Sequence, residues 1–172
     1  MEEQSFRVGF GIDAHRFLKQ GSKKKDKKDL VLGGVKIANH RALKAHSDGD
    51  VVLHSLCDAL LGALALDELS DIGDLFPDSD SQNKDRDSKE FVLEVMKLLK
   101  REQYNLGNVD ITVVAQSPKL KKYKPLMKKA IASLLQAELS QVNIKATTTE
   151  KMDDIGKNKG IYCYCVVLIY LS

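Results

Sequence analysis

The sequence predicts an α/β fold, an α+β sandwich in which helices pack on one face of a mixed β-sheet. Short apolar runs typical of strands are interspersed with segments whose apolar residues recur at helical spacing. These two kinds of segment alternate only in part along the chain, as they do in α+β proteins. The 172 residues, 43% of them hydrophobic, suffice for one core and contain no repeat or linker. Residues 1–172 are therefore expected to form a single domain.

The N-terminal part of the chain supplies the first strands and the first helix. Residues 6–11 alternate in polarity and indicate a strand, and residues 30–37 indicate either a strand broken by two glycines or a short hairpin. Residues 9–14 match the letters of a G-x-G-x-x-A dinucleotide-binding motif. We reject that interpretation because a lysine-rich loop follows, where the motif requires a helix. Residues 50–66 carry leucines at helical spacing behind serine and aspartate caps, and predict a helix.

The rest of the chain begins with an acidic loop, predicted at residues 67–87. Loops of this length are usually functional or mobile. Apolar periodicity and short apolar runs then predict two helices and three strands. The helices are expected at residues 88–102 and 125–138, and the strands at 109–115, 142–149 and 161–171.

Composition and the chain's N-terminus exclude several classes of protein. The net charge of +3, from 27 basic and 24 acidic residues, implies no strong field of one sign. The longest apolar run, at residues 166–171, is far shorter than the roughly 20 residues of a membrane helix. Residues 1–5 lack the basic and apolar regions of a signal peptide. We therefore expect no membrane association and a cytoplasmic location.

Neither the cysteines nor the lysine-rich segment requires a functional role. Three cysteines without a C-x-x-C pair indicate free thiols packed in the core of a protein from a reducing compartment. Residues 19–29 contain a run of lysines that is interrupted by acids and has no aromatic residue for base stacking. This pattern favours a solvated loop over a nucleic-acid-binding segment. We expect no function for His40.

Polar residues near the N-terminus and on the first predicted helix suggest a metal site. Asp13 and His15 are two residues apart, so on an extended segment both side chains point the same way. His54 can join them on folding, and two histidines with one aspartate form a suitable zinc ligand set with positions open for substrate. Asp58, one helical turn beyond His54, can fix its tautomer. The alternative is that His15 and His54 are unrelated surface or core residues that bind no metal.

Two further polar clusters have possible functions. Thr147, Thr148 and Thr149 stand beside Glu150 at the end of a predicted strand, where hydroxyls and an acid can contact phosphate oxygens and a hard cation such as Mg²⁺. A simpler interpretation is a threonine-rich strand end followed by a turn. The acidic residues within 71–80 suit the hydroxyls of a sugar or polyol, although most acidic loops are merely solvated.

Eight motifs, taken in order, connect these clusters to a known family. They are GIDAH (11–15), AHSDGD (45–50), LLGA (60–63), DIG (71–73), FPDSD (76–80), LGNVD (106–110), AQSPK (115–119) and KATTTEK (145–151). With these motifs the chain resembles, nearly end to end, the 2-C-methyl-D-erythritol 2,4-cyclodiphosphate synthase family of the non-mevalonate isoprenoid pathway.

The resemblance implies a phosphorus–oxygen lyase. Its substrate would be 4-diphosphocytidyl-2-C-methyl-D-erythritol 2-phosphate, which is cyclised to 2-C-methyl-D-erythritol 2,4-cyclodiphosphate with release of CMP. An oxygen of the 2-phosphate attacks the β-phosphorus, so like charges meet, and cations and an in-line geometry must offset the repulsion. The resemblance also implies a homotrimer with active sites between subunits, and no nucleic-acid partner.

The resemblance assigns roles to individual residues. It implies that Asp13, His15 and His54 bind zinc, that Glu150 binds a second cation, Mg²⁺ or Mn²⁺, and that His46 and Thr148 are catalytic. The implied contacts with the methylerythritol and its phosphate are Ser47, Asp71, Ile72, Gly73, Phe76, Pro77, Asp78, Ser79 and Asp80. The implied contacts with the cytidine end are Ala115, Gln116, Ser117, Pro118, Lys119, Leu120, Lys121, Thr147 and Thr149, together with Thr148.

The chain departs from the family pattern after Lys151. Asp154 stands where the family has an aromatic residue, and Lys157 stands in place of an arginine. Lys157 can still contact a substrate phosphate, but as a point charge and not as a bidentate fork. Two other functions remain open: a different metal-dependent phosphoesterase or nucleotide-binding enzyme, which would give hydrolysis products, and a nucleic-acid-binding domain that uses the lysines of residues 23–28.

Overall fold

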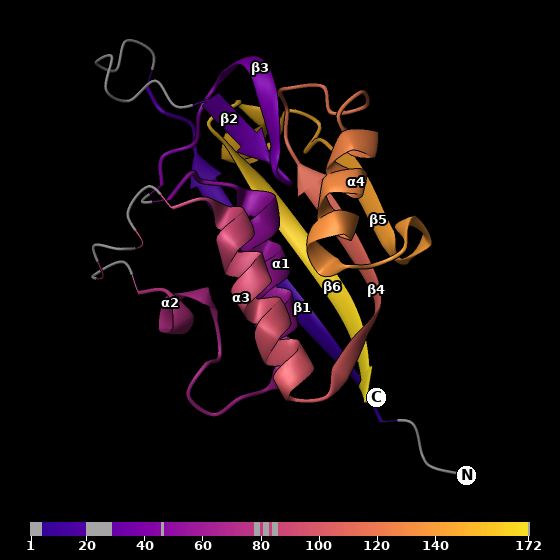
Figure 1. The fold of residues 1–172 in the computed structure, drawn as a ribbon. Helices are drawn as coiled ribbons and strands as arrows, with labels where there is room; N and C mark the ends of the chain where they lie inside the picture. Colours follow the sequence, from indigo (N-terminus) through magenta and orange to yellow (C-terminus); the bar gives the residue numbers. More distant parts are fainter. Residues whose placement is uncertain are drawn as a thin grey trace.

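The computed structural model describes residues 5–19, 29–45, 47–77, 80, 83 and 86–171 (Figure 1). A four-stranded sheet with the order β1-β6-β4-β5 lies at its centre. Strands β1 (Phe6–Arg16) and β4 (Tyr104–Val114) pair antiparallel with β6 (Gly160–Leu171), whereas β5 (Val142–Thr147) pairs parallel with β4. The predicted mixed sheet is therefore confirmed.

Three longer helices form a layer over one face of this sheet, as predicted (Figure 1). Helix α1 (Val51–Leu64) packs on β1 and β6, α4 (Lys124–Leu135) packs beside β5, and α3 (Ser88–Arg101) packs against α1. The shorter helical segments are α2 (Ile72–Leu75), the 3₁₀ turn η3 (Leu139–Gln141) and α5 (Asp153–Gly156). Within the described ranges, no helix is both long and apolar enough to span a membrane.

The buried carboxylate of Asp50 joins a β-hairpin to the start of α1. The hairpin consists of β2 (Asp29–Leu32) and β3 (Val35–Arg41), so the second of the two sequence interpretations is correct. Asp50 accepts hydrogen bonds from the backbone N–H groups of Gly33 and Gly34 in the turn, and from those of Val52 and Leu53 in α1. Four donors satisfy a side chain that is fully buried, and they hold the hairpin against the helix that carries His54.

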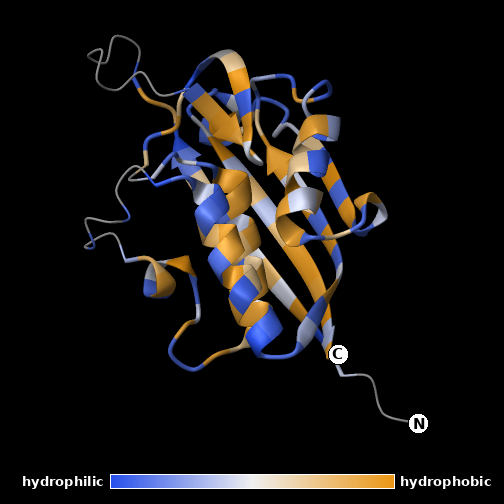
Figure 2. Ribbon diagram, viewed as in Figure 1, coloured by the Kyte–Doolittle hydropathy of each residue, from blue (hydrophilic) through white to orange (hydrophobic). Residues whose placement is uncertain are grey.

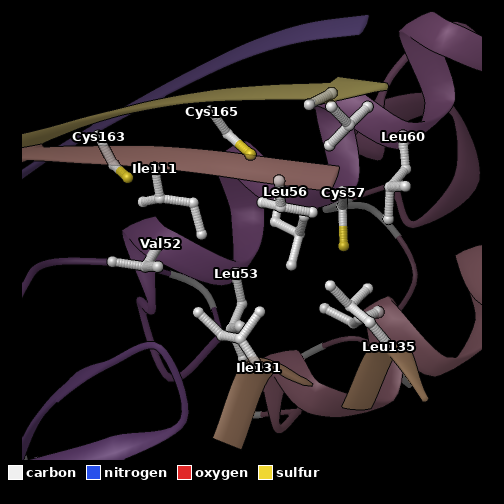
Figure 3. Close-up of a cluster of buried hydrophobic side chains, with 14 of the residues drawn as sticks. Val52, Leu53, Leu56, Cys57, Leu60, Ile111, Ile131, Leu135, Cys163 and Cys165 are labelled. Carbon is white, nitrogen blue, oxygen red and sulfur yellow. The ribbon is translucent and has the colours of Figure 1, made fainter. Parts of the chain in front are cut away.

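The core lies between the helical layer and the sheet. Figure 3 shows leucines of α1 facing Ile131 and Leu135 of α4 on one side and Ile111 and Cys165 of the sheet on the other. Figure 2 shows hydrophobic residues along β6, where it runs behind the helices. The three cysteines, Cys57, Cys163 and Cys165, are free and buried, as predicted.

The glycines of the rejected dinucleotide motif allow α1 to lie close to β1. A Cβ atom at Gly9 would be 1.8 Å from the carbonyl oxygen of Ala59, and one at Gly11 would be 2.1 Å from that of Ser55. Hydrogen replaces a side chain at the two points where the helix backbone meets the strand. The G-x-G pattern therefore has a packing role, and the residues described after β1, 17–19, are not helical. The lysine-rich loop predicted at 19–29 lies mostly outside the described residues.

Strand β1 is longer than its apolar pattern predicts. It continues from the predicted end at residue 11 to Arg16, because its pairing with β6 persists through Asp13 opposite Cys163 and His15 opposite Ile161. The extension places two predicted metal ligands on a regular strand, with their side chains on the helix-covered face. The predicted loop at 67–87 likewise differs, since it contains the short helix α2.

The opposite face of the sheet bears no helical layer among the described residues, and it is apolar on β1 and β6. On β4 and β5 the same face is polar, with Asp110 paired to Lys145. Phe6, Val8, Phe10 and Ile12 of β1 point to this side and are 48–66% exposed. Tyr162 and Val166 of β6 are also among the exposed large hydrophobic residues. Aromatic pairs such as Phe10 and Tyr164, with ring centroids 6.4 Å apart, extend across both strands. Exposed apolar faces of this kind are typical of interaction surfaces.

Candidate active site

Asp13, His15 and His54 converge at the end of β1 beside the first turn of α1. Nδ1 of His54 lies 2.9 Å from Oδ2 of Asp13 and 3.3 Å from Nε2 of His15, and this nitrogen of His15 is 2.9 Å from the same Asp13 oxygen. Ligand atoms of a tetrahedral zinc site, each about 2.0–2.1 Å from the ion, are about 3.3 Å apart. The donor set therefore fits a metal ion. Among the described residues it is the one group of three or more such side chains that converge.

The electrostatics of the cluster already favour a positive charge between these three side chains. Burial opposes ionisation of Asp13, but its hydrogen bonds and ion pairs with His15 and His54 outweigh burial and hold the pKa of this carboxyl well below its usual range. Burial likewise opposes protonation of His54, yet contact with Asp13 and the charges of Asp50 and Asp48 raise the pKa of its imidazole. A metal cation can replace the imidazolium proton as the partner of Asp13.

The second nitrogen of His54 faces hydroxyl groups and not Asp58. Nε2 of His54 is 2.9 Å from Oγ of Ser88 and 3.1 Å from Oγ of Ser47. Asp58 instead accepts a hydrogen bond from the backbone N–H of Ile72, at 2.9 Å. The tautomer-fixing contact predicted for Asp58 is therefore not made, because α2 returns to this side of α1 and uses its carboxylate.

A cavity of about 700 Å³ opens beside the metal cluster. Most of the predicted methylerythritol contacts described by the structure lie in its wall. The lining residues are Asp13, His15, Lys44, Ala45, Ser47, His54, Asp58, Ile72, Gly73, Phe76, Pro77, Asn83 and Phe91. Asp71 and Asp80 do not line the cavity. The carboxylate of Asp71 caps α2 by accepting from the N–H of Asp74, and the N–H of Asp80 donates to the carbonyl of Pro77.

Three predicted site residues, His46, Asp78 and Ser79, lie outside the residues that the structure describes. The structure adds four lining residues that the sequence did not single out: Lys44, Ala45, Asn83 and Phe91. Phe91 stacks on Phe76 with ring centroids 4.4 Å apart, so α3 contributes an apolar wall to the cavity. No sequence motif signals Phe91, because in α3 it is one of several apolar residues at helical spacing.

The predicted cytidine contacts surround a second, smaller cavity of about 350 Å³. Its lining residues are Ala115, Pro118, Lys119, Leu120, Lys121, Lys124, Ala146, Thr147 and Thr148. Gln116, Ser117 and Thr149 are not among them. Oγ of Ser117 is instead 3.0 Å from Nε2 of His40, a half-buried side chain on β3 for which no function was expected. His40 therefore ties the hairpin to the loop after β4.

Glu150 lies beside the threonines on a loop with unusual backbone geometry. Oγ1 of Thr148 donates to Oε1 of Glu150 at 2.8 Å, and Oγ1 of Thr149 donates to the carbonyl oxygen of Met152 at 2.7 Å. Glu150 and Lys151 both have positive φ, 52° and 65°. Glu150 is exposed and lines neither cavity, and the same holds for Lys157.

The two cavities share no lining residue. One contains the metal cluster and the loop around α2, and the other lies between the loop after β4 and the end of β5. Within one chain the structure therefore brings together the predicted zinc ligands with the polyol contacts, and the cytidine contacts with Thr148, as two separate groups.

Known proteins resemble this chain over almost its whole length. The profile of the YgbB family matches residues 6–170. A 2-C-methyl-D-erythritol 2,4-cyclodiphosphate synthase from Francisella tularensis subsp. novicida (strain U112) is 47% identical over 166 residues, which are 96% of this chain and 99% of that protein.

Solved structures share the fold. IspF from Plasmodium falciparum in a CDP complex is 36% identical, with a TM-score of 0.80 and 99% of both chains covered. The bifunctional IspDF from Campylobacter jejuni is 39% identical, with a TM-score of 0.89 over 99% of this chain, which spans 43% of that longer one. From the metal cluster, the two cavities and these matches we conclude that the chain belongs to the YgbB family, the family of 2-C-methyl-D-erythritol 2,4-cyclodiphosphate synthases.

Proposed function

We propose that this protein converts 4-diphosphocytidyl-2-C-methyl-D-erythritol 2-phosphate into 2-C-methyl-D-erythritol 2,4-cyclodiphosphate and releases CMP. The observation that carries the proposal is the convergence of Asp13, His15 and His54 on the wall of the larger cavity. The free, buried thiols suit a reducing compartment, and we place the reaction in the cytoplasm.

The metal held by Asp13, His15 and His54 is proposed to be zinc. Two imidazoles and one carboxylate suit this ion and leave a coordination position for substrate. Glu150, exposed and hydrogen-bonded to Thr148, is proposed to bind a second cation, Mg²⁺ or Mn²⁺. When bound, the two cations supply Lewis-acid polarisation of phosphoryl oxygens and neutralise the charge that develops in the transition state.

The residues of the larger cavity then bind and orient the methylerythritol end. Hydroxyl and backbone groups of Ser47 and Gly73 face the polyol, while Ile72 and Phe76 supply apolar wall. Asp71, Pro77, Asp78, Ser79 and Asp80 complete the proposed contacts by resemblance. His46 is proposed to stabilise the transferring phosphoryl group together with Thr148. The protein needs no nucleophile of its own, because the 2-phosphate oxygen attacks the β-phosphorus directly.

The smaller cavity is proposed to hold the cytidine end. In the wall of this cavity, Ala115, Pro118 and Thr147 are available for the base and ribose, and Lys119 and Lys121 for phosphate charge. Gln116, Ser117 and Thr149 are proposed as contacts by resemblance alone. The CDP complex of the Plasmodium falciparum relative supports a cytidine nucleotide as ligand. Lys157 is proposed as a further phosphate contact, acting as a point charge.

A homotrimer would join the two cavities into one active site. The open sheet face presents Phe10, Ile12, Tyr162 and Val166 for burial against another subunit. Since the metal cavity and the cytidine cavity of one chain share no residue, a site composed of one cavity from each of two neighbours accounts for both. We therefore propose that the active sites lie between subunits.

Phosphorus-31 NMR of the purified protein with substrate and Mg²⁺ tests the proposal. We expect a cyclic diphosphate and CMP, loss of turnover on zinc chelation, and recovery when zinc is restored. Hydrolysis products would instead identify a metal-dependent phosphoesterase. Absence of any turnover by folded, zinc-loaded protein would contradict the proposed activity and direct attention to the altered loop at residues 153–159.

A further inference from the structure

We propose that Ser88 and Asp48 are positioning residues for the metal site: they hold His54 in the tautomer that leaves its Nδ1 free to bind the ion. The inference rests on the proposed metal-dependent function and extends it to residues on two other elements. Neither residue is among the ligands or substrate contacts derived above.

The hydrogen bonds of Ser88 have a defined direction. Oγ of Ser88 contacts both Nε2 of His54, at 2.9 Å, and Oδ1 of Asp48. A carboxylate can only accept, so the hydroxyl proton of Ser88 points to Asp48. The remaining lone pairs of Ser88 Oγ then accept from His54, which places the imidazole proton on Nε2. The lone pair of Nδ1 is left facing Asp13 and His15.

Backbone hydrogen bonds hold the carboxylate of Asp48 in place as the acceptor. Its Oδ2 also accepts the backbone N–H of Ser88 at 3.1 Å, and its Oδ1 accepts the N–H of Asp50 at 3.2 Å. Ser88 is the first residue of α3, where the helix dipole favours a negative charge. The side chain of Ser88 is fully buried, so water cannot replace the Asp48 carboxylate as the partner of its hydroxyl.

Ser88 differs from Ser47, whose hydroxyl is also near Nε2 of His54. Ser47 Oγ is farther away, at 3.1 Å, and accepts the N–H of Gly49 at 3.2 Å. Ser47 lines the cavity and is already proposed to meet substrate, whereas Ser88 does not line it. Ser88 therefore provides the contact with His54 that persists when substrate enters or leaves.

Partners of this kind tune metal sites, because they fix the ring orientation and tautomer of the ligand. The test compares two substitutions of nearly equal shape. Ser88→Thr keeps the hydroxyl and Ser88→Val removes it, and both add bulk at the same buried position. Ser55→Ala is a matched control for Ser88→Ala, since Ser55 is equally buried on α1 but donates to the carbonyl of Val52.

The zinc dissociation constant is measured by competition with a chromogenic chelator, on protein first stripped of metal. We expect Ser88→Val and Ser88→Ala to raise it by about 10- to 100-fold, as is typical when such partners are lost. Ser88→Thr and Ser55→Ala should stay close to the wild type. The visible spectrum of the Co²⁺-loaded protein reports the geometry around the ion. It should therefore change in Ser88→Val and Ser88→Ala, but not in Ser88→Thr or Ser55→Ala.

Equal zinc affinity and equal Co²⁺ spectra for Ser88→Val and Ser88→Thr would overturn the positioning role while the metal site itself stands. A wild-type protein that binds no zinc would contradict the proposed metal site as well. Should the variants fail to fold, nitrogen-15 NMR of histidine-labelled, zinc-loaded wild type decides: we expect His54 to carry its proton on Nε2, and a proton on Nδ1 would refute the inference.

Discussion

At the scale of single residues, the candidate metal site depends on which atom of each side chain faces the other two. His54 uses Nδ1 toward Asp13 and His15, and Nε2 toward Ser88 and Ser47. Sequence spacing suggested the three ligands but assigned the supporting role to Asp58. That assignment was wrong because spacing along a helix shows which residues share a face, and not which distant element returns to that face.

Replacing His54 tests the ligand assignment directly. We expect His54→Ala to lose stoichiometric zinc while far-ultraviolet circular dichroism stays native, since α1 keeps its Asp50 cap and its buried leucines. Zinc is measured by atomic emission after desalting. A variant that retains one equivalent of zinc would remove His54 from the ligand set.

Replacing Glu150 tests the binding of the second cation independently of zinc binding. Glu150→Gln keeps the size of the side chain and its hydrogen bond with Thr148 but removes the charge. We expect a higher Mg²⁺ or Mn²⁺ concentration for half-maximal activity, with normal zinc content. An unchanged divalent-ion titration would exclude Glu150 from the mechanism.

The three cysteines should be unreactive in the native protein. Burial raises the pKa of Cys163 to about 12 and those of Cys57 and Cys165 well above the ordinary value, so little nucleophilic thiolate exists at pH 8. We expect Ellman's reagent to modify them slowly at this pH and to titrate three thiols at once in guanidinium chloride. Fast modification of the native protein would contradict their burial.

At the scale of elements, the position of the site follows from how closely α1 approaches β1. Gly9 and Gly11 remove side chains where the helix crosses the strand, and Asp50 fixes the start of the helix on the β2–β3 hairpin. The contact of Ser88 with His54 places the start of α3 beside the same part of α1. The residues of the metal cluster meet because three backbone segments are held together, each by a contact of its own.

A pair of glycine substitutions tests the helix–strand contact. Gly9→Ala would place its Cβ 1.8 Å from the carbonyl oxygen of Ala59 and should cost about 1–3 kcal/mol or more. Gly62→Ala is the control, because its Cβ would meet only the carbonyl of Phe10 at 3.9 Å. In the helix interior this control should stabilise by about 0.5–1 kcal/mol. Equal urea midpoints for the two variants would contradict the close packing.

At the scale of the whole molecule, one face of the sheet is covered by helices and the other is open. The open face is apolar across β1 and β6, and the two groups of proposed substrate contacts lie in separate cavities. Both features are explained if subunits associate through the open face and complete one another's sites.

A charge on the open face should dissociate the assembly. We expect Phe10→Asp to leave the subunit folded, because Phe10 is 58% exposed, but to lower the mass found by light scattering to that of one chain and to abolish turnover. Leu93→Asp on α3, an exposed apolar position away from this face, should do neither. A fully active, monomeric Phe10→Asp protein would refute the inter-subunit site.

The sequence pattern left open whether His54 joins Asp13 and His15, but local patterns sufficed for the helices, for the strands with continuous apolar runs, for the free buried thiols and for the pairing of Asp13 with His15 on an extended segment. Each of these depends on periodicity, on composition or on a motif within a short stretch of sequence. The hairpin is local, but only the pairing of β2 with β3 distinguishes it from a single broken strand. The polar end of β1 depended on pairing with β6, which lies far away in the chain. The same is true of Ser88, which is 34 residues from His54, and of His40, which is 77 residues from Ser117. Hydrogen bonds between such distant residues exist only once the backbone has closed the intervening loops, so no spacing within the sequence could reveal them.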